Sequence, residues 1–151
     1  MFGFFKKKAL NIRDFREKPV KTMLVDCYER VVGTPMEQGY TELVLYTHDQ
    51  DTALLERYVD GGLDAERRTT FLVPLQAAQD AFDAIAQTQM AQWNDRKNTI
   101  AICGMMYVCK FPDGNGGYIR VSSEAMPEDG VHAFYAVRSA ISAYLKDEYR
   151  Q

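Results

Sequence analysis

The residues that could do nucleophilic or metal chemistry are few: three cysteines and two histidines among 151 residues. Cys103 and Cys109 lie six positions apart, and the histidines are His48 and His132. Neither the HExxH pattern nor the CxxC spacing of zinc sites occurs. The sequence therefore predicts no metal and no cofactor.

Catalysis by a thiol or a hydroxyl would need a base close to the nucleophile. His132 could serve Cys103 only if the fold brought the strand of Cys103 beside the last helix, and Ser123 does not belong to a GxSxG elbow. A free cysteine more often packs as a small hydrophobe. We therefore expect a non-enzymatic protein, with Cys103, Ser123 and His132 as the catalytic candidates of the alternative.

The cysteines also bear on the compartment. In a strand, Cys103 and Cys109 would lie about 20 Å apart, too far for a disulfide, whereas Cys27 could reach either one. An odd cysteine count without a signal-peptide pattern at the start predicts reduced thiols and a cytoplasmic location. No stretch approaches the roughly 20 apolar residues that span a bilayer.

Residues 1–18 form a basic amphipathic arm. Residues 1–21 carry seven Lys or Arg against two acids, whereas the remaining residues carry eleven against nineteen, within a net charge of -3. Phe2, Phe5, Ala9, Ile12 and Phe15 recur at helical steps. Such an arm can lie on its own acidic body, or contact an anionic membrane or a partner through six residues: Phe2, Phe4, Phe5, Lys6, Lys7 and Lys8.

These candidates need a scaffold, and the pattern after Pro19 predicts a sheet first. Residues 20–32 fit a strand and a helix almost equally well, and the turn-forming residues that follow favour the strand. Residues 41–47, 53–59 and 67–74 then read as an antiparallel meander separated by short polar turns.

Two helices and a hairpin complete the predicted scaffold. Apolar residues recur at helical steps over 75–93. Residues 99–111 and 118–124 read as strands joined by PDGNGG, a strong hairpin signal. A last helix opens near MPEDG and runs toward residue 145. The sequence thus predicts an α+β fold over 19–151, an antiparallel sheet of about five to six strands covered by two long helices, with a possible short N-terminal helix.

Composition leaves three functional hypotheses open. The first is a protein-interaction or self-associating module, favoured by a set of tyrosines that would enrich an interface: Tyr107, Tyr118, Tyr135, Tyr144 and Tyr149. The second is a small-molecule binding or hydrolytic domain with a pocket between sheet and helices. The third is peripheral membrane attachment through the arm. The acidic body argues against specific nucleic-acid binding.

Overall fold

Six strands, two α-helices and three short 3-10 turns make up the described part of the chain. The computed structural model describes residues 10–15, 18, 21–31, 39–59, 68–93, 105–122 and 130–151. The strands are β1 (Met23–Val31), β2 (Tyr40–Thr47), β3 (Thr52–Val59), β4 (Arg68–Pro74), β5 (Met105–Pro112) and β6 (Tyr118–Ser122). The helices are α1 (Gln76–Thr88) and α2 (Gly130–Ser142), and the 3-10 turns are Ile12–Phe15, Met90–Trp93 and Asp147–Tyr149.

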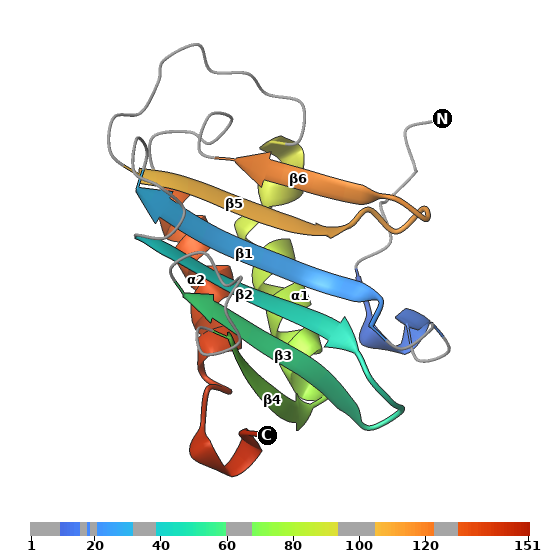
Figure 1. The fold of residues 1–151 in the computed structure, drawn as a ribbon. Helices are drawn as coiled ribbons and strands as arrows, with labels where there is room; N and C mark the ends of the chain where they lie inside the picture. Colours follow the sequence, from blue (N-terminus) through green and yellow to red (C-terminus); the bar gives the residue numbers. More distant parts are fainter. Residues whose placement is uncertain are drawn as a thin grey trace, which may run out of the picture.

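The strands stand in the order β4-β3-β2-β1-β5-β6, and every neighbouring pair is antiparallel (Figure 1). The meander β1 to β4 fills one side of the sheet, and the β5–β6 hairpin pairs with the other side of β1. The predicted α+β class, with a six-stranded antiparallel sheet and two helices, is confirmed.

Within the ambiguous segment 20–32, Met23–Val31 forms the strand β1, as expected. β1 pairs with β2 on one side and with β5 on the other, so its backbone groups are bonded along both edges. Val25 and Cys27 are buried toward the helices, whereas Asp26 and Tyr28 point to the opposite face. Tertiary pairing therefore decides between the two periodicities that the sequence carries equally.

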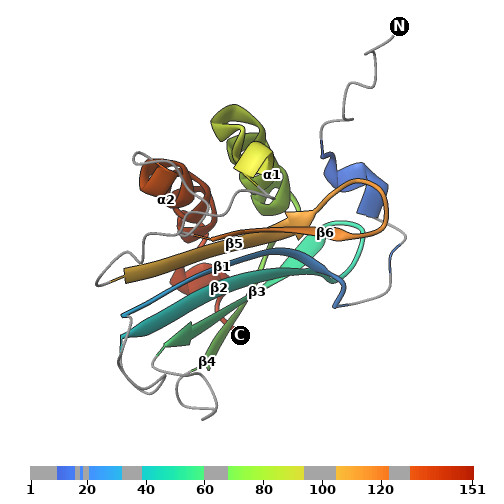
Figure 2. The same ribbon diagram turned by 90° about the horizontal axis from the view of Figure 1, so that it is seen from above.

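Both helices cover the same face of the sheet (Figure 2). α1 contributes Phe82 and Ile85 to the core, and α2 contributes Phe134, Val137 and Ile141, all less than 5% exposed. From the sheet, the odd-numbered residues of successive strands meet them. These include Val25, Cys27, Leu43, Leu45, Ala53, Leu55, Phe71, Val73, Cys109, Phe111, Ile119 and Val121.

The first helix is shorter than its apolar pattern predicts. The periodicity runs to residue 93, but α1 ends at Thr88 because Gln89 adopts a left-handed conformation with φ of 57°. A 3-10 turn, Met90–Trp93, follows directly in the sequence, and its Met90 is completely buried. The apolar pattern extends past the end of α1 because this second, separate turn also places an apolar side chain in the core.

The termini of the described part lie against the sheet and the helices. Within the arm, Ile12–Phe15 forms a 3-10 turn, which fits the short N-terminal helix expected there; the Ile12 amide donates to Gln79 of α1, and the Phe15 ring lies 5.6 Å from that of Phe82. At the other end, the Gln151 amide donates to the Thr70 carbonyl at 2.9 Å and extends the edge of β4.

Candidate functional site

The face of the sheet opposite the helices is the larger candidate site. From Asp26 onward, even-numbered strand residues point to this side, because each strand pairs even with even across the sheet. We call this side the open face, since neither described helix lies over it (Figure 2). Polar and aromatic side chains dominate its centre.

A pair of carboxyl groups on β1 and β2 forms the middle of the open face. Asp26 shares a hydrogen bond with Glu42, and its Oδ1 atom is buried without a hydrogen-bond partner among the described residues. Burial, followed by the bond and the negative charge of Glu42, raises the pKa of Asp26 to about 9, although Lys110 opposes the shift. Asp26 is therefore protonated at neutral pH.

Tyrosines enclose this pair. The Tyr40 hydroxyl donates to Glu42 Oε1 at 2.7 Å, and the Tyr40 ring stacks on that of Tyr28 with centroids 5.7 Å apart. Burial and the bond to Glu42 raise the pKa of Tyr40. Tyr28 also meets a guanidinium nitrogen of Arg120 at 3.4 Å. Tyr40 thus holds the half-buried carboxylate of Glu42 by a hydrogen bond.

On β3, another carboxylate is bonded by a tyrosine and, in addition, by a lysine. Glu56 is only 3% exposed, accepts a hydrogen bond from Tyr58 and pairs with Lys21 at 3.0 Å. Burial by itself would raise the pKa of Glu56, but the bonds from Tyr58 and Lys21 outweigh it and lower that pKa. The Lys21 side chain is 53% exposed and lies over the Tyr46 ring, so the cation faces outward and the carboxylate inward.

Among the described residues, the net charge on the open face is therefore positive. In the described part of the chain, five basic residues belong to this face: Lys21, Arg30, Arg68, Lys110 and Arg120. They stand against the three carboxyl groups described above, one of which is protonated. The chain as a whole has a net charge of -3, so the surface elsewhere is more acidic than the average. The Arg30 Nε atom is buried without a hydrogen-bond partner in the described part of the chain. Of these five bases, Lys21, Arg68 and Arg120 are exposed and could meet a partner.

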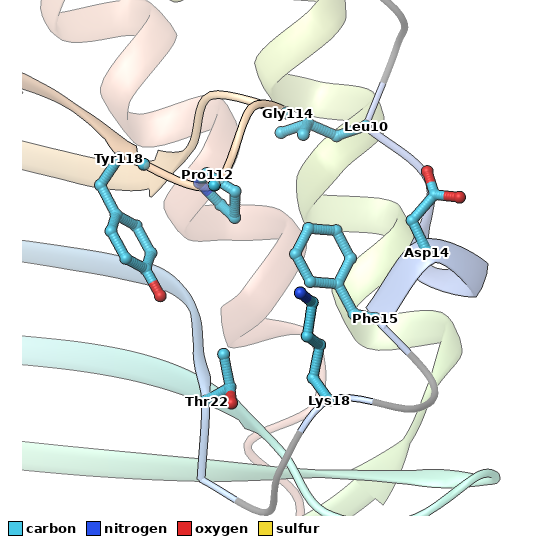
Figure 3. Close-up of a pocket in the computed structure, with 10 residues that line it drawn as sticks. Leu10, Asp14, Phe15, Lys18, Thr22, Pro112, Gly114 and Tyr118 are labelled. Carbon is cyan, nitrogen blue, oxygen red and sulfur yellow. The ribbon is translucent and has the colours of Figure 1, made fainter.

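A cavity of about 430 Å³ lies at one end of the sheet, between the N-terminal 3-10 turn and the β5–β6 hairpin (Figure 3). Its apolar walls include Phe15 and Pro112, and its polar groups include Lys18, Thr22 and Tyr118. In Figure 3 the amino group of Lys18 points into the space between Phe15 and Tyr118. This volume lies within the range of small-ligand pockets.

The hairpin that borders the cavity is held by its own aspartate. Asp113 Oδ1 accepts the backbone amides of Asn115 at 2.7 Å and Gly117 at 3.0 Å. Gly114 and Gly116 adopt φ of 85° and 90°, which other residues rarely adopt. The PDGNGG stretch is thus a hairpin loop, as its sequence predicts.

The predicted catalytic residues cannot be assembled from the described part of the chain. His132 lies near the start of α2 and is exposed. Cys103 and Ser123 lie outside the described residues, so their meeting with His132 stays a prediction. Of the tyrosines proposed for an interface, Tyr118 and Tyr135 are exposed, at 44% and 40%.

The membrane hypothesis also stays a prediction. Its contact residues lie outside the described part: Phe2, Phe4, Phe5, Lys6, Lys7 and Lys8. No helix within the described ranges is long and apolar enough to cross a membrane. Likewise, no group of three or more His, Cys, Asp or Glu that could hold a metal ion occurs among the residues searched, which are the described ones.

Two cysteines that the sequence could not pair lie side by side. Cys27 on β1 stands directly opposite Cys109 on β5, and their Sγ atoms are 3.4 Å apart in the buried core. Both are free thiols. The contact to Cys109 and burial raise the pKa of Cys27. Of the two partners considered from sequence, Cys109 lies beside Cys27, and Cys103 lies outside the described residues.

Sequence reasoning missed the open face. The signal was available, since Asp26, Tyr28 and Arg30 recur at every second position of β1, and Glu56 and Tyr58 do so on β3. The strand register that brings these residues together into one patch could not be read from the sequence. In comparisons with known proteins, no family model, curated protein or solved structure matches the chain.

Proposed function

We propose that this chain is a non-enzymatic binding domain whose open face docks an acidic segment of a partner protein. One observation carries the proposal: a sheet face over which neither described helix lies is rich in tyrosine and carries the exposed cations Lys21, Arg68 and Arg120, on a chain whose net charge is -3. Charge complementarity selects the acidic partner, since unlike charges steer association and like charges oppose it.

The internal bonding of the carboxylates supports this choice of partner. Tyrosine hydroxyls donate hydrogen bonds to Glu42 and Glu56, and Lys21 pairs with Glu56. The negative charge of these carboxylates is therefore partly balanced by groups of the same face. Lys110 stands opposite Asp26 across the β1–β5 pair, and the exposed Arg120 stands opposite Lys110 on β6. Tyrosine and arginine are the side chains enriched at protein interfaces, where their rings and guanidinium groups give area and directed hydrogen bonds.

A titration followed by heteronuclear NMR tests the proposal, with soluble poly-L-glutamate as the probe. Shifts should gather on the even-numbered residues of the strands. The double variant Lys110→Glu with Arg120→Glu should weaken binding about tenfold or more, because two favourable contacts become repulsive. The matched control, Lys146→Glu with Arg150→Glu, changes the net charge equally near the C-terminus and should bind as the parent does.

Three outcomes would overturn the proposal. Equal weakening by both double variants would show that only net charge matters. Tighter binding of poly-uridylate than of poly-L-glutamate at the same ionic strength would assign the face to a nucleic acid. Light scattering that shows a concentration-dependent dimer, abolished by the hairpin double variant alone, would assign it to a second copy of the chain.

The cavity at the hairpin supports a second candidate function, binding of a small amphipathic anion. Among the described residues that line the cavity, Lys18 is the one cation, and apolar surface comes from Phe15, Leu10 and Pro112. Asp14 also lines the cavity, but its carboxylate points away from the Lys18 amino group in Figure 3. An aromatic or aliphatic acid would place its charge near Lys18 and its apolar part on Phe15.

Anilinonaphthalene sulfonate is a suitable probe for this cavity, because its fluorescence rises when the rings leave water. We expect one site per chain, weakened several-fold by Lys18→Gln and unaffected by Lys146→Gln. Neutral phenylnaphthylamine should bind less tightly than the sulfonate. Equal binding of both dyes to the parent and to Lys18→Gln would contradict the assignment and leave the open-face proposal untouched.

A further inference from the structure

The geometry points to a covalent modification site in the core: we propose that Cys27 and Cys109 are an oxidisable dithiol that forms a disulfide between β1 and β5. The Sγ atoms are 3.4 Å apart, and the two residues face each other directly across the strand pair. This proposal is independent of the open face, which lies on the other side of the sheet.

The register places the two cysteines in the favourable kind of strand pair. The Val31 amide donates to the Gly39 carbonyl at 3.0 Å, which fixes the hydrogen-bonded pairs of β1 with β2 at every second residue. Counting back along β1, Cys27 and Leu43 form such a pair, so the backbone groups of Cys27 point to β2. Toward β5, Cys27 and Cys109 are therefore a non-hydrogen-bonded pair.

That kind of pair brings the backbones close enough for a bond. Directly opposite residues in a non-hydrogen-bonded antiparallel pair have Cα atoms about 4.5 Å apart. Disulfides are found at Cα separations of about 4.4 to 6.8 Å. Small changes in the two side-chain torsions would therefore close the remaining gap between the sulfur atoms, without a change of register.

The oxidant we name is a small disulfide such as oxidised glutathione. One cysteine thiolate attacks a sulfur of the oxidant, forming a mixed disulfide and releasing one reduced glutathione as its thiolate. The second cysteine then attacks the protein sulfur of the mixed disulfide and displaces the second glutathione. In total, two protons and two electrons pass from the protein thiols to glutathione.

Burial sets the rate of this reaction. Cys27 is 1% exposed and Cys109 is 0% exposed, so an oxidant reaches them only when the sheet and the helices separate locally. The raised pKa of Cys27 also keeps the thiol protonated in the closed state. We therefore expect slow oxidation of the native protein and rapid oxidation during refolding.

The bond would link distant parts of the chain. The two cysteines are 82 positions apart, and the link would join the meander to the hairpin. Closing a loop of this size typically raises the folding equilibrium constant by about 30- to 1,000-fold. Oxidation should accordingly move the urea midpoint upward, which a surface disulfide between mobile segments would not do.

The experiment uses the full chain without substitutions. Urea-unfolded protein is diluted into a mixture of reduced and oxidised glutathione, and native protein is incubated in the same mixture. Free thiols are then alkylated, and peptides are mapped by mass spectrometry. We expect the refolded sample to lose two hydrogens per chain, with Cys27 and Cys109 peptides linked and Cys103 alkylated. The linked form should resist urea better than the reduced form.

A Cys103→Ser variant provides the control, because it removes the third thiol and should give the same linked peptide at the same yield. The proposal is overturned if refolding gives Cys103 in the dominant disulfide. It is also overturned if Cys27 and Cys109 emerge alkylated or separately glutathionylated, or if the linked form has a lower urea midpoint than the reduced form.

Discussion

On β1, Asp26 and Cys27 are neighbours in sequence, yet they belong to opposite environments. Cys27 packs among apolar side chains from the helices, whereas Asp26 lies on the open face beside Glu42 and the tyrosines. Both are largely buried. The difference shows that burial on this sheet has two causes: cover by helices on one face, and close packing of polar and aromatic side chains on the other.

The two causes imply different responses to substitution. A side chain sealed by helices leaves a cavity when it is shortened, because the helices cannot follow it. A half-buried side chain on the open face, such as Leu54, borders solvent, so water or a rotated neighbour can take its place. The three predictions below compare the faces directly, in order of decreasing effect.

Leu54 and Leu55 give the largest contrast, since they are adjacent on β3 and point to opposite faces. Leu55 is fully buried against the helices, and Leu54 is half-buried on the open face. We expect Leu55→Ala to lower the free energy of unfolding by about 2 to 5 kcal/mol, and Leu54→Ala by less than about 1 kcal/mol. Urea denaturation of both variants measures the difference; equal losses would show that the two faces are covered alike.

The Asp26→Asn variant should reverse the usual sign of a polar substitution. Its pKa is about 9 when folded and 3.8 ordinarily, so the folded state binds the proton more tightly. The free energy of unfolding of the parent therefore falls as the pH rises from about 4 to 9, since the unfolded chain releases this proton first. The neutral asparagine removes that dependence.

We expect Asp26→Asn to be more stable than the parent by more than about 1 kcal/mol at pH 8, and equally stable near pH 4. Urea midpoints at pH 4, 6 and 8 would record this divergence. Stability curves that run parallel for the two proteins would contradict the protonated state of Asp26 and would restore a full negative charge to the centre of the open face.

Lys21→Met should have the smallest effect and the opposite pH dependence. The pKa of Glu56 is lowered when folded, so the stability it provides is present above its ordinary value of 4.5 and is lost as the pH falls through the folded value. Lys21 is half exposed, which limits the expected loss at pH 7 to about 0.5 to 1 kcal/mol. The exposed Lys146 provides the control substitution, Lys146→Met. A loss that persists at pH 3 would point to packing of Lys21 on Tyr46 as the main contribution.

Local patterns in the sequence were enough to predict the strands, the two helices and the hairpin. The alternation in 41–47 and the PDGNGG turn are statements about neighbouring residues, and their physical causes act over a few positions. The early end of α1 at Gln89 escaped prediction because its backbone conformation, and not its side-chain type, breaks the helix.

The candidate sites escaped prediction for a different reason. Asp26 meets Glu42, and Cys27 meets Cys109, only after strands far apart in sequence pair in one register. Net charge was misleading too, because a total of -3 conceals a face on which Lys21, Arg68 and Arg120 are exposed and Glu56 is buried. Each of these properties belongs to the sheet as a whole, and none belongs to a segment.

The even-with-even pairing of the strands has a consequence for how such a protein could diverge during evolution. Odd-numbered strand positions meet the helices, and even-numbered ones form the open face, so selection for folding and selection for a partner act on alternate residues. We expect relatives that changed partner to keep the odd positions apolar while the even ones drift. A search for such relatives should score odd and even strand positions separately, because a contiguous motif combines positions under selection for folding with positions under selection for a partner.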